Sequence, residues 1–91
     1  MTPPDDLDRF TETELAQLHM DTYRRALGHF KQAELHLGVM TGLPHLSAEY
    51  DAARAMMRAA RSAGTEAHEL LRAIGRQLDA IRGARKAATD A

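Results

Sequence analysis

The chain has 91 residues, enough for one small domain, and its 12 Lys and Arg against 13 Asp and Glu give a formal net charge of −1. This balance excludes a strongly basic nucleic-acid-binding tail. Hydrophobic residues make up 44% of the chain and aromatic residues only 4%, and the apolar content is mostly Ala, Leu and Met, which favours helices over a β-sandwich or barrel. The absence of Cys excludes disulfides, thiolate metal ligands and a Cys nucleophile.

The N-terminal region predicts a flexible lead-in over residues 1–10, because it carries two prolines and three aspartates. Its acidic start is not typical of a signal peptide, and no apolar run approaches the roughly 20 residues of a membrane span. We therefore expect a cytoplasmic protein without membrane contact.

The first helix has a specific start signal at Thr11. The run Thr11-Glu12-Thr13-Glu14 fits a capping box, in which the Thr11 hydroxyl and the Glu14 carboxylate each accept a hydrogen bond from the other residue's backbone N–H. Phe10 and Leu15 stand where a hydrophobic staple needs them. Helical spacing of apolar residues then continues to about Met40.

The one strong break follows at Gly42 and Pro44. Gly42 tolerates a left-handed conformation, and Pro44 keeps the residue before it out of the helical region. Ser47 can cap a second helix, in which apolar residues recur in one unbroken register over positions 50–81.

The sequence thus predicts an all-α fold, an antiparallel helical hairpin that forms a single domain over residues 11–88, with a frayed C-terminus over 89–91. Gly64 leaves an alternative open, because a break there would divide the second helix and give three helices in all.

A heptad reading of both helices predicts how they pair. In the first helix the a and d positions are Ala16, Met20, Tyr23, Leu27, Phe30, Glu34 and Leu37. Folding the chain back over residues 41–46 pairs positions whose numbers add up to 87, such as Tyr23 with Gly64 and Leu37 with Tyr50. Large residues then face small ones in most layers, as close packing requires.

One edge of this hairpin carries the predicted interface. The apolar residues that a lone hairpin would leave exposed are Met40, Met56, Ala63, Leu70, Leu78 and Ile81. They predict a homodimer that closes a four-helix bundle, a higher homo-oligomer, or binding to a helix of a partner protein. A monomeric three-helix bundle broken at Gly64 is the alternative. The corresponding function is that of a small non-catalytic assembly or adaptor protein.

The opposite edge is basic. Its candidate polyanion-binding residues are Arg54, Arg58, Arg61 and Arg72. One interpretation is a solvated face in which acids three residues upstream pair with arginines, as Asp79 would with Arg82. The other is binding of nucleic acid or another polyanion along a cationic stripe.

Three histidines are candidate metal ligands: His29, His36 and His68. Beside an apolar interface they could hold iron or zinc between subunits in a ferritin-like assembly. The alternative is that they are half-exposed boundary residues, and no other cofactor is expected.

No enzyme signature is present in the sequence, which offers no Ser/His/Asp arrangement and no phosphate-binding loop. Glu34 is the one ionisable residue at an a position of the heptads. It is interpreted as a register-setting residue that accepts a hydrogen bond from Tyr50 or reaches Lys31, and not as a catalytic acid.

The layout of two helices around Thr41-Gly42-Leu43 is similar to that of the Trp-X-Gly secretion substrates of type VII systems, although this chain has no Trp. It also resembles the two-helix dimeric regulators of plasmid copy number, which bind RNA on the bundle surface. Both likenesses concern the fold and assign no functional residue here.

Overall fold

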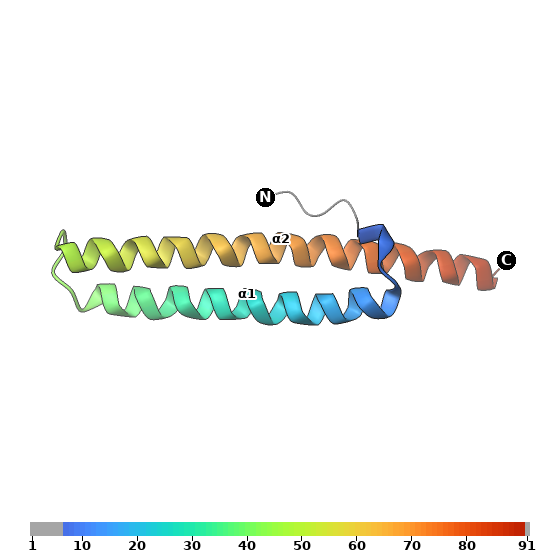
Figure 1. Ribbon diagram of the computed structural model, residues 1–91, viewed down its shortest axis with the longest axis horizontal. Coiled ribbons are helices and arrows are strands. Elements are labelled where there is room, and N and C mark those ends of the chain that lie inside the picture. The colour runs from blue at the N-terminus through green and yellow to red at the C-terminus, as the bar shows by residue number, and fades with distance from the viewer. Residues whose placement is uncertain (1–6, 91) are drawn as a thin grey trace.

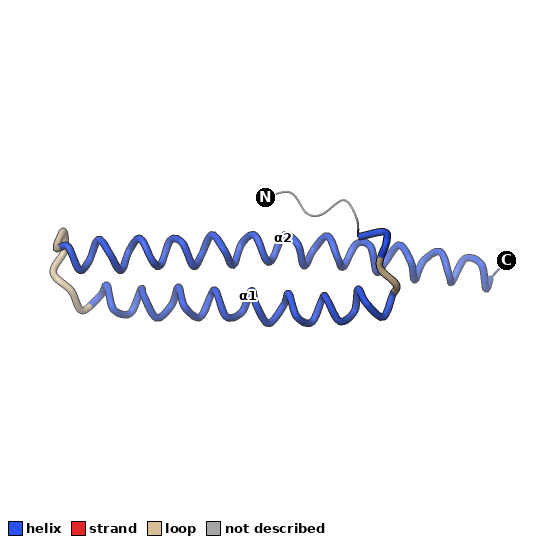
Figure 2. Tube along the Cα trace, viewed as in Figure 1, coloured by secondary structure: helices blue, strands red, loops and turns tan. Residues whose placement is uncertain are grey.

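Two long antiparallel helices make up almost all of the computed structural model, which describes residues 7–90 (Figure 1). A 3-10 turn η1 (Leu7–Arg9) precedes helix α1 (Glu12–Thr41) and helix α2 (Ala48–Asp90). No strand occurs in these residues (Figure 2). The predicted helical hairpin is confirmed, and α2 runs through Gly64 without a break, so the three-helix alternative is wrong.

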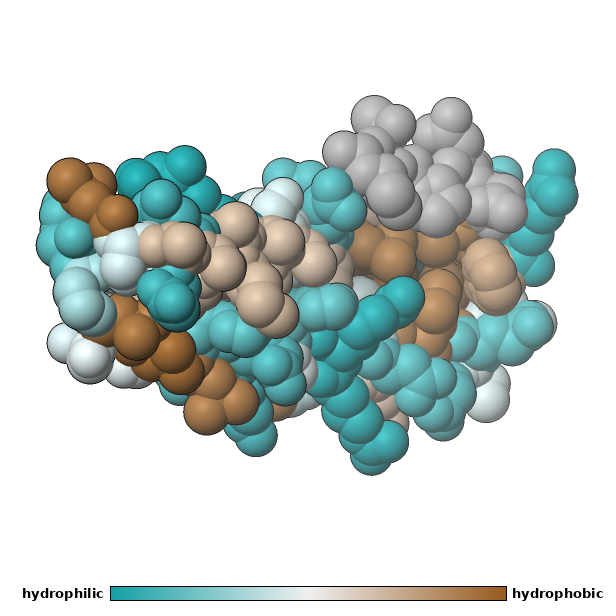
Figure 3. Space-filling view, turned by 60° about the vertical axis from the view of Figure 1, so that its left-hand side comes forward, coloured by the Kyte–Doolittle hydropathy of each residue, from teal (hydrophilic) through white to brown (hydrophobic). Residues whose placement is uncertain are grey.

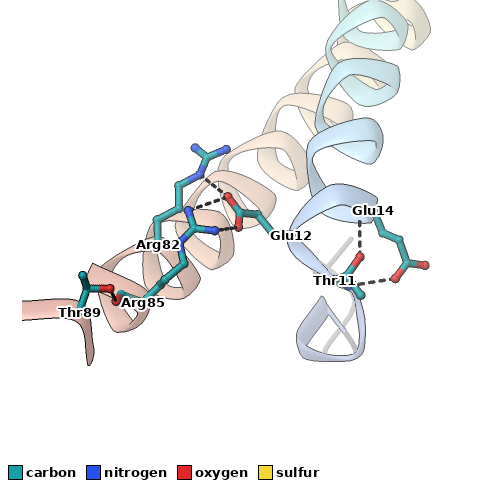
Figure 4. A network of polar contacts seen from close by, with 6 residues as sticks. All are labelled: Thr11, Glu12, Glu14, Arg82, Arg85 and Thr89. Carbon is teal, nitrogen blue, oxygen red and sulfur yellow. Dashed lines mark hydrogen bonds and ion pairs between the residues drawn. The ribbon is translucent and has the colours of Figure 1, made fainter. Parts of the chain in front are cut away.

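The capping box at the start of α1 is confirmed. The backbone N–H of Glu14 donates to the Thr11 hydroxyl at 3.2 Å, and the backbone N–H of Thr11 donates to the Glu14 carboxylate at 3.0 Å (Figure 4). Accepting this backbone hydrogen bond lowers the pKa of Glu14 below its ordinary value. Phe10 packs against the cluster that contains Leu15, as the staple predicts.

The two ends of the domain differ from the prediction. Leu7 is buried in a core cluster formed with α1 and α2, so the lead-in predicted over 1–10 is wrong from residue 7 onward, and residues 1–6 lie outside the described part. At the C-terminal end, α2 continues to Asp90, and the hydroxyl of Thr89 donates to the Arg85 carbonyl at 2.9 Å. Residues 89 and 90 are therefore helical, and residue 91 is not described.

The turn between the helices uses a different residue for its left-handed conformation. Gly42 has φ −94° and ψ −2°, and its N–H donates to the Val39 carbonyl at 3.1 Å. The positive φ of 66° belongs to Leu46. Ser47 caps α2 as predicted, since its hydroxyl accepts from the backbone N–H of Tyr50 at 3.1 Å.

The core consists of two separate apolar clusters, one at each end of the hairpin. The first contains Leu7, Leu15, Ala73, Ile74 and Leu78, and the second contains Ala33, Met40, Ala53 and Met57. Between them the buried residues are small or polar: Thr22, Ala26, Gly64 and Ala67. The helices therefore meet through short side chains at the middle of the hairpin.

The observed pairing differs from the predicted one at Gly64. Phe30 faces Gly64, so their residue numbers add up to 94. The prediction paired Tyr23 with Gly64, whose numbers add up to 87. Leu43 in the turn packs against the same cluster as Tyr50, so the turn itself covers the beginning of α2. The prediction placed Leu37 opposite Tyr50, but Leu37 is 43% exposed.

The buried face of α1 is also rotated from the prediction. It carries Leu15, Thr22, Ala26, Ala33 and Met40, whereas the predicted a and d residues lie beside the contact. These buried side chains are mostly shorter than those at the a and d positions, so this face allows the closer approach.

An ion-pair clamp joins the start of α1 to α2. The carboxylate of Glu12 accepts from Nε of Arg82 at 3.1 Å and from two guanidinium nitrogens of Arg85 at 2.5 and 3.3 Å (Figure 4). The hydrogen bond from Arg82 is the main reason that the pKa of Glu12 lies below its ordinary value. Arg82 thus binds Glu12, and the pair predicted with Asp79 does not form in the described residues.

The close contact at Gly64 predicts a difference between two Gly→Ala variants. A Cβ at Gly64 would lie 2.9 Å from a ring atom of Phe30, whereas a Cβ at Gly28 meets nothing within 4 Å. Gly28→Ala should raise the free energy of unfolding by about 0.5–1 kcal/mol through helix propensity. The free energy of unfolding of Gly64→Ala, measured in urea, should be at least about 1 kcal/mol lower than that of Gly28→Ala, because the Phe30 ring must move to make room for the Cβ. Equal gains would contradict the close approach of the helices.

The clamp predicts a pH dependence of stability. Because the pKa of Glu12 is below its ordinary value of 4.5 in the folded chain, its contribution is present above that value and lost as the pH falls through the folded pKa. Wild type should unfold at a higher temperature than Glu12→Gln near pH 7, and the difference should shrink as the pH falls below 4.5, by circular dichroism. Glu69→Gln is the control, since Glu69 forms no ion pair within residues 7–90. A gap between wild type and Glu12→Gln that is independent of pH would contradict the clamp.

Candidate protein-interaction surface

One face of α1 carries large apolar side chains that the hairpin does not cover. Its members, the α1 stripe, are Met20 (50% exposed), Tyr23 (51%), Leu27 (40%), Phe30 (37%) and Leu37 (43%). Their spacing of three, four and seven residues places them on one side of the helix. Figure 3 shows apolar side chains open to the surface near the interhelical turn, between hydrophilic ones.

Helix α1 therefore has two apolar faces. One face packs against α2 through Leu15, Ala26, Ala33 and Met40. The α1 stripe lies beside this face, and the Phe30 ring still touches α2 at Gly64. A helix that only covers one neighbour needs a single apolar face, with polar residues on the remainder. The α1 stripe exceeds what the contact with α2 requires, and 37–51% of each of its side chains stays exposed in the single chain.

Cations border the α1 stripe on both sides. Arg24 and Lys31 each directly follow a stripe residue on α1 and are exposed. On α2, Arg61 lines a surface hollow together with Phe30 and Leu37, and Arg54 lies on the same edge two helical turns earlier. We call Arg24, Lys31, Arg54 and Arg61 the basic border.

Glu34 interrupts the stripe with a negative charge. It lines one hollow with Arg61 and another with Lys31. The predicted hydrogen bond from Tyr50 is not formed, because the Tyr50 ring packs beside His45 near the turn, with ring centroids 4.9 Å apart. Glu34 is exposed, so its carboxylate is accessible to a binding partner.

The interface predicted from the sequence does not form a continuous exposed edge. Met40 and Leu78 are buried in the two core clusters, Ala63, Leu70 and Ile81 are half-buried, and only Met56 is mostly exposed, at 55%. The rotation of α1 places the row containing Met40 in the contact with α2, and Leu78 is buried in the cluster with Leu7 and Leu15 at the other end of the hairpin. Met40 and Leu78 are therefore buried in the single chain and do not belong to an exposed edge.

The predicted polyanion-binding residues remain at the surface. The arginines in question, all exposed on α2, are Arg54, Arg58, Arg61 and Arg72. None of them forms an ion pair within residues 7–90, so the predicted lacing with upstream acids is not formed there. Two of them, Arg54 and Arg61, belong to the basic border.

The histidines considered as metal ligands are not gathered. His29 lies half-buried in a hollow with Ala63 and Glu66, and His36 is two turns further along α1. His68 is exposed on the opposite edge, which it shares with Arg61. Within residues 7–90 no group of three or more His, Asp or Glu side chains is placed to hold a metal ion.

The sequence reasoning missed the α1 stripe as an exposed surface and missed the Glu12 clamp. A signal for the stripe was available, because small residues recur at Thr22, Ala26 and Ala33 and compete with the larger a and d residues for the contact with α2. No comparable signal identifies Glu12, whose partners Arg82 and Arg85 are distant in the sequence.

Comparisons with protein-family models, with curated proteins and with solved structures find no match to this chain. Between residues 7 and 90, neither helix is long and apolar enough to cross a membrane. The function is therefore argued from the surface of the chain itself.

The distinction between core and stripe can be tested by truncating one residue of each. Ile74 is fully buried, so Ile74→Ala should lower the free energy of unfolding by about 2–5 kcal/mol. Leu27 is 40% exposed, and Leu27→Ala should cost less than about 1 kcal/mol. Urea unfolding followed by circular dichroism measures both. Equal losses of unfolding free energy in the two variants would mean that Leu27 lies in the core, as the pairing predicted from the sequence requires.

Proposed function

We propose that this chain is a small non-catalytic protein-interaction module, an adaptor or assembly protein that binds a partner helix along the α1 stripe. The observation that supports this function is the heptad row of five large apolar side chains that stays 37–51% exposed beside a well-formed hairpin. Single exposed apolar residues are ordinary, whereas several large ones in one row along a helix are typical of an interaction surface.

The geometry favours a helix as the occupant. An amphipathic helix laid along α1 places its own apolar residues at the same intervals, so that both rows interdigitate. Burying the exposed part of the stripe contributes on the order of 5 kcal/mol before the entropic cost of association. Such a surface alone gives weak and reversible binding, which suits an adaptor.

Site-specific photo-crosslinking in cells that naturally produce the chain tests this function. A benzophenone amino acid replaces Tyr23 or Leu27 in the stripe, or Gln32 on the opposite face of α1 as the matched control. We expect discrete crosslinked species from the two stripe positions and none from position 32. A species of twice the chain mass and a species with another protein both support the interaction function.

Two outcomes contradict it. One is the absence of any crosslink from positions 23 and 27, and the other is an equal pattern from position 32, which would indicate random collision. Circular dichroism of each purified variant confirms that the hairpin is intact, since all three positions are exposed.

A further inference from the structure

We infer that the occupant of the α1 stripe is an amphipathic helix with acidic flanks, and not a second copy of this chain. This inference rests on the proposed function, because it specifies the chemistry of the partner that the stripe binds. It is argued from the charges that border the stripe.

The basic border supplies the charge complementarity. From Tyr23 to Leu37 the stripe runs between Arg24 and Lys31 on one side and the arginines of α2 on the other. None of these cations forms an ion pair within residues 7–90. A docked helix would place the positions that flank its apolar row against these cations, where Glu or Asp is attracted and Lys or Arg is repelled.

A second copy fails the same criterion. If two α1 stripes packed antiparallel around the midpoint between Leu27 and Phe30, Arg24 of one copy would approach Lys31 of the other. In a parallel arrangement Arg24 and Lys31 of one copy would approach the α2 arginines of the other. Both arrangements bring like charges together along the border, which disfavours self-association on this face.

Glu34 adds a second element of specificity. It is the only carboxylate in the stripe between Tyr23 and Leu37, and it separates Phe30 from Leu37 at a position where the heptad requires an apolar residue. A partner helix that carries one Lys or Arg at the facing apolar position would pair with it and fix the register of binding. The expected partner is therefore acidic along both flanks and basic at one central position.

Binding of two synthetic helical peptides tests the inference. Both peptides have the same three heptads with Leu and Ala at a and d and one Lys that faces Glu34. The acidic peptide carries Glu at every e and g position, and the basic peptide carries Lys there. Fluorescence anisotropy with the full chain should show that the acidic peptide binds about tenfold more tightly than the basic one at low salt. This preference should shrink as the salt concentration rises.

Charge reversal on the chain provides the matched control. Arg24→Glu, Lys31→Glu and Arg61→Glu together should abolish or invert the preference, and circular dichroism should show an intact hairpin. Arg25→Glu, Arg76→Glu and Lys86→Glu make the same change in net charge on exposed residues outside the basic border, and they should leave the preference within about twofold. Equal losses in the two triple variants would indicate general charge attraction and overturn the inference.

Other occupants give distinct results. A concentration-dependent dimer in light scattering that Leu27→Lys disperses would identify a second copy as the occupant. A fluorescent DNA duplex that displaces the acidic peptide would identify a polyanion. Either result, or equal binding of the two peptides, would overturn the acidic helix, while crosslinks from positions 23 and 27 would still support the proposed interaction function.

Discussion

The contact between Phe30 and Gly64 is the constraint on which the arrangement of this hairpin depends. Because position 64 has no side chain, the aromatic ring lies directly over the backbone of α2, within 3.1 Å of the place that a Cβ would occupy. The neighbouring buried residues Thr22, Ala26 and Ala67 are also short, so the two helices approach closely at mid-length. This closeness leaves no room between the helices for Tyr23 or Leu27, which therefore stand at the edge and form the stripe.

The same constraint explains why the stability of the hairpin is concentrated at its ends. The middle of the contact buries little apolar surface, so the burial is supplied by the cluster around Ile74 and by the cluster around Met57. The turn η1 and the Glu12 clamp act at the first end, where Leu7 extends the apolar cover and the carboxylate holds two arginines of α2. The lead-in is therefore a structural part of the domain from residue 7 onward.

The sequence was sufficient for the hairpin and insufficient for the pairing of its helices. Capping by Thr11 and Ser47 and the unbroken period of α2 were readable, because both depend on residues that are close in sequence. Phe30 and Tyr23 are both large, so placing either of them over Gly64 satisfies the same rule of large against small. Only long-range contacts, such as that between Glu12 and Arg82, distinguish the two registers, and periodicity contains no information about them.

The misplaced face matters more for function than the misplaced register. With the a and d residues of α1 in the core, the basic edge of α2 would border nothing apolar and would read as a solvated or polyanion-binding face. With α1 rotated, Arg61 lies beside Phe30 and Leu37, and apolar attraction and positive charge act on the same ligand. A nucleic acid would pair with the cations and leave the leucines exposed to water. An uncharged helix would cover the leucines and leave the arginines unpaired. An acidic amphipathic helix satisfies both, which is why the chemistry of this surface favours that ligand.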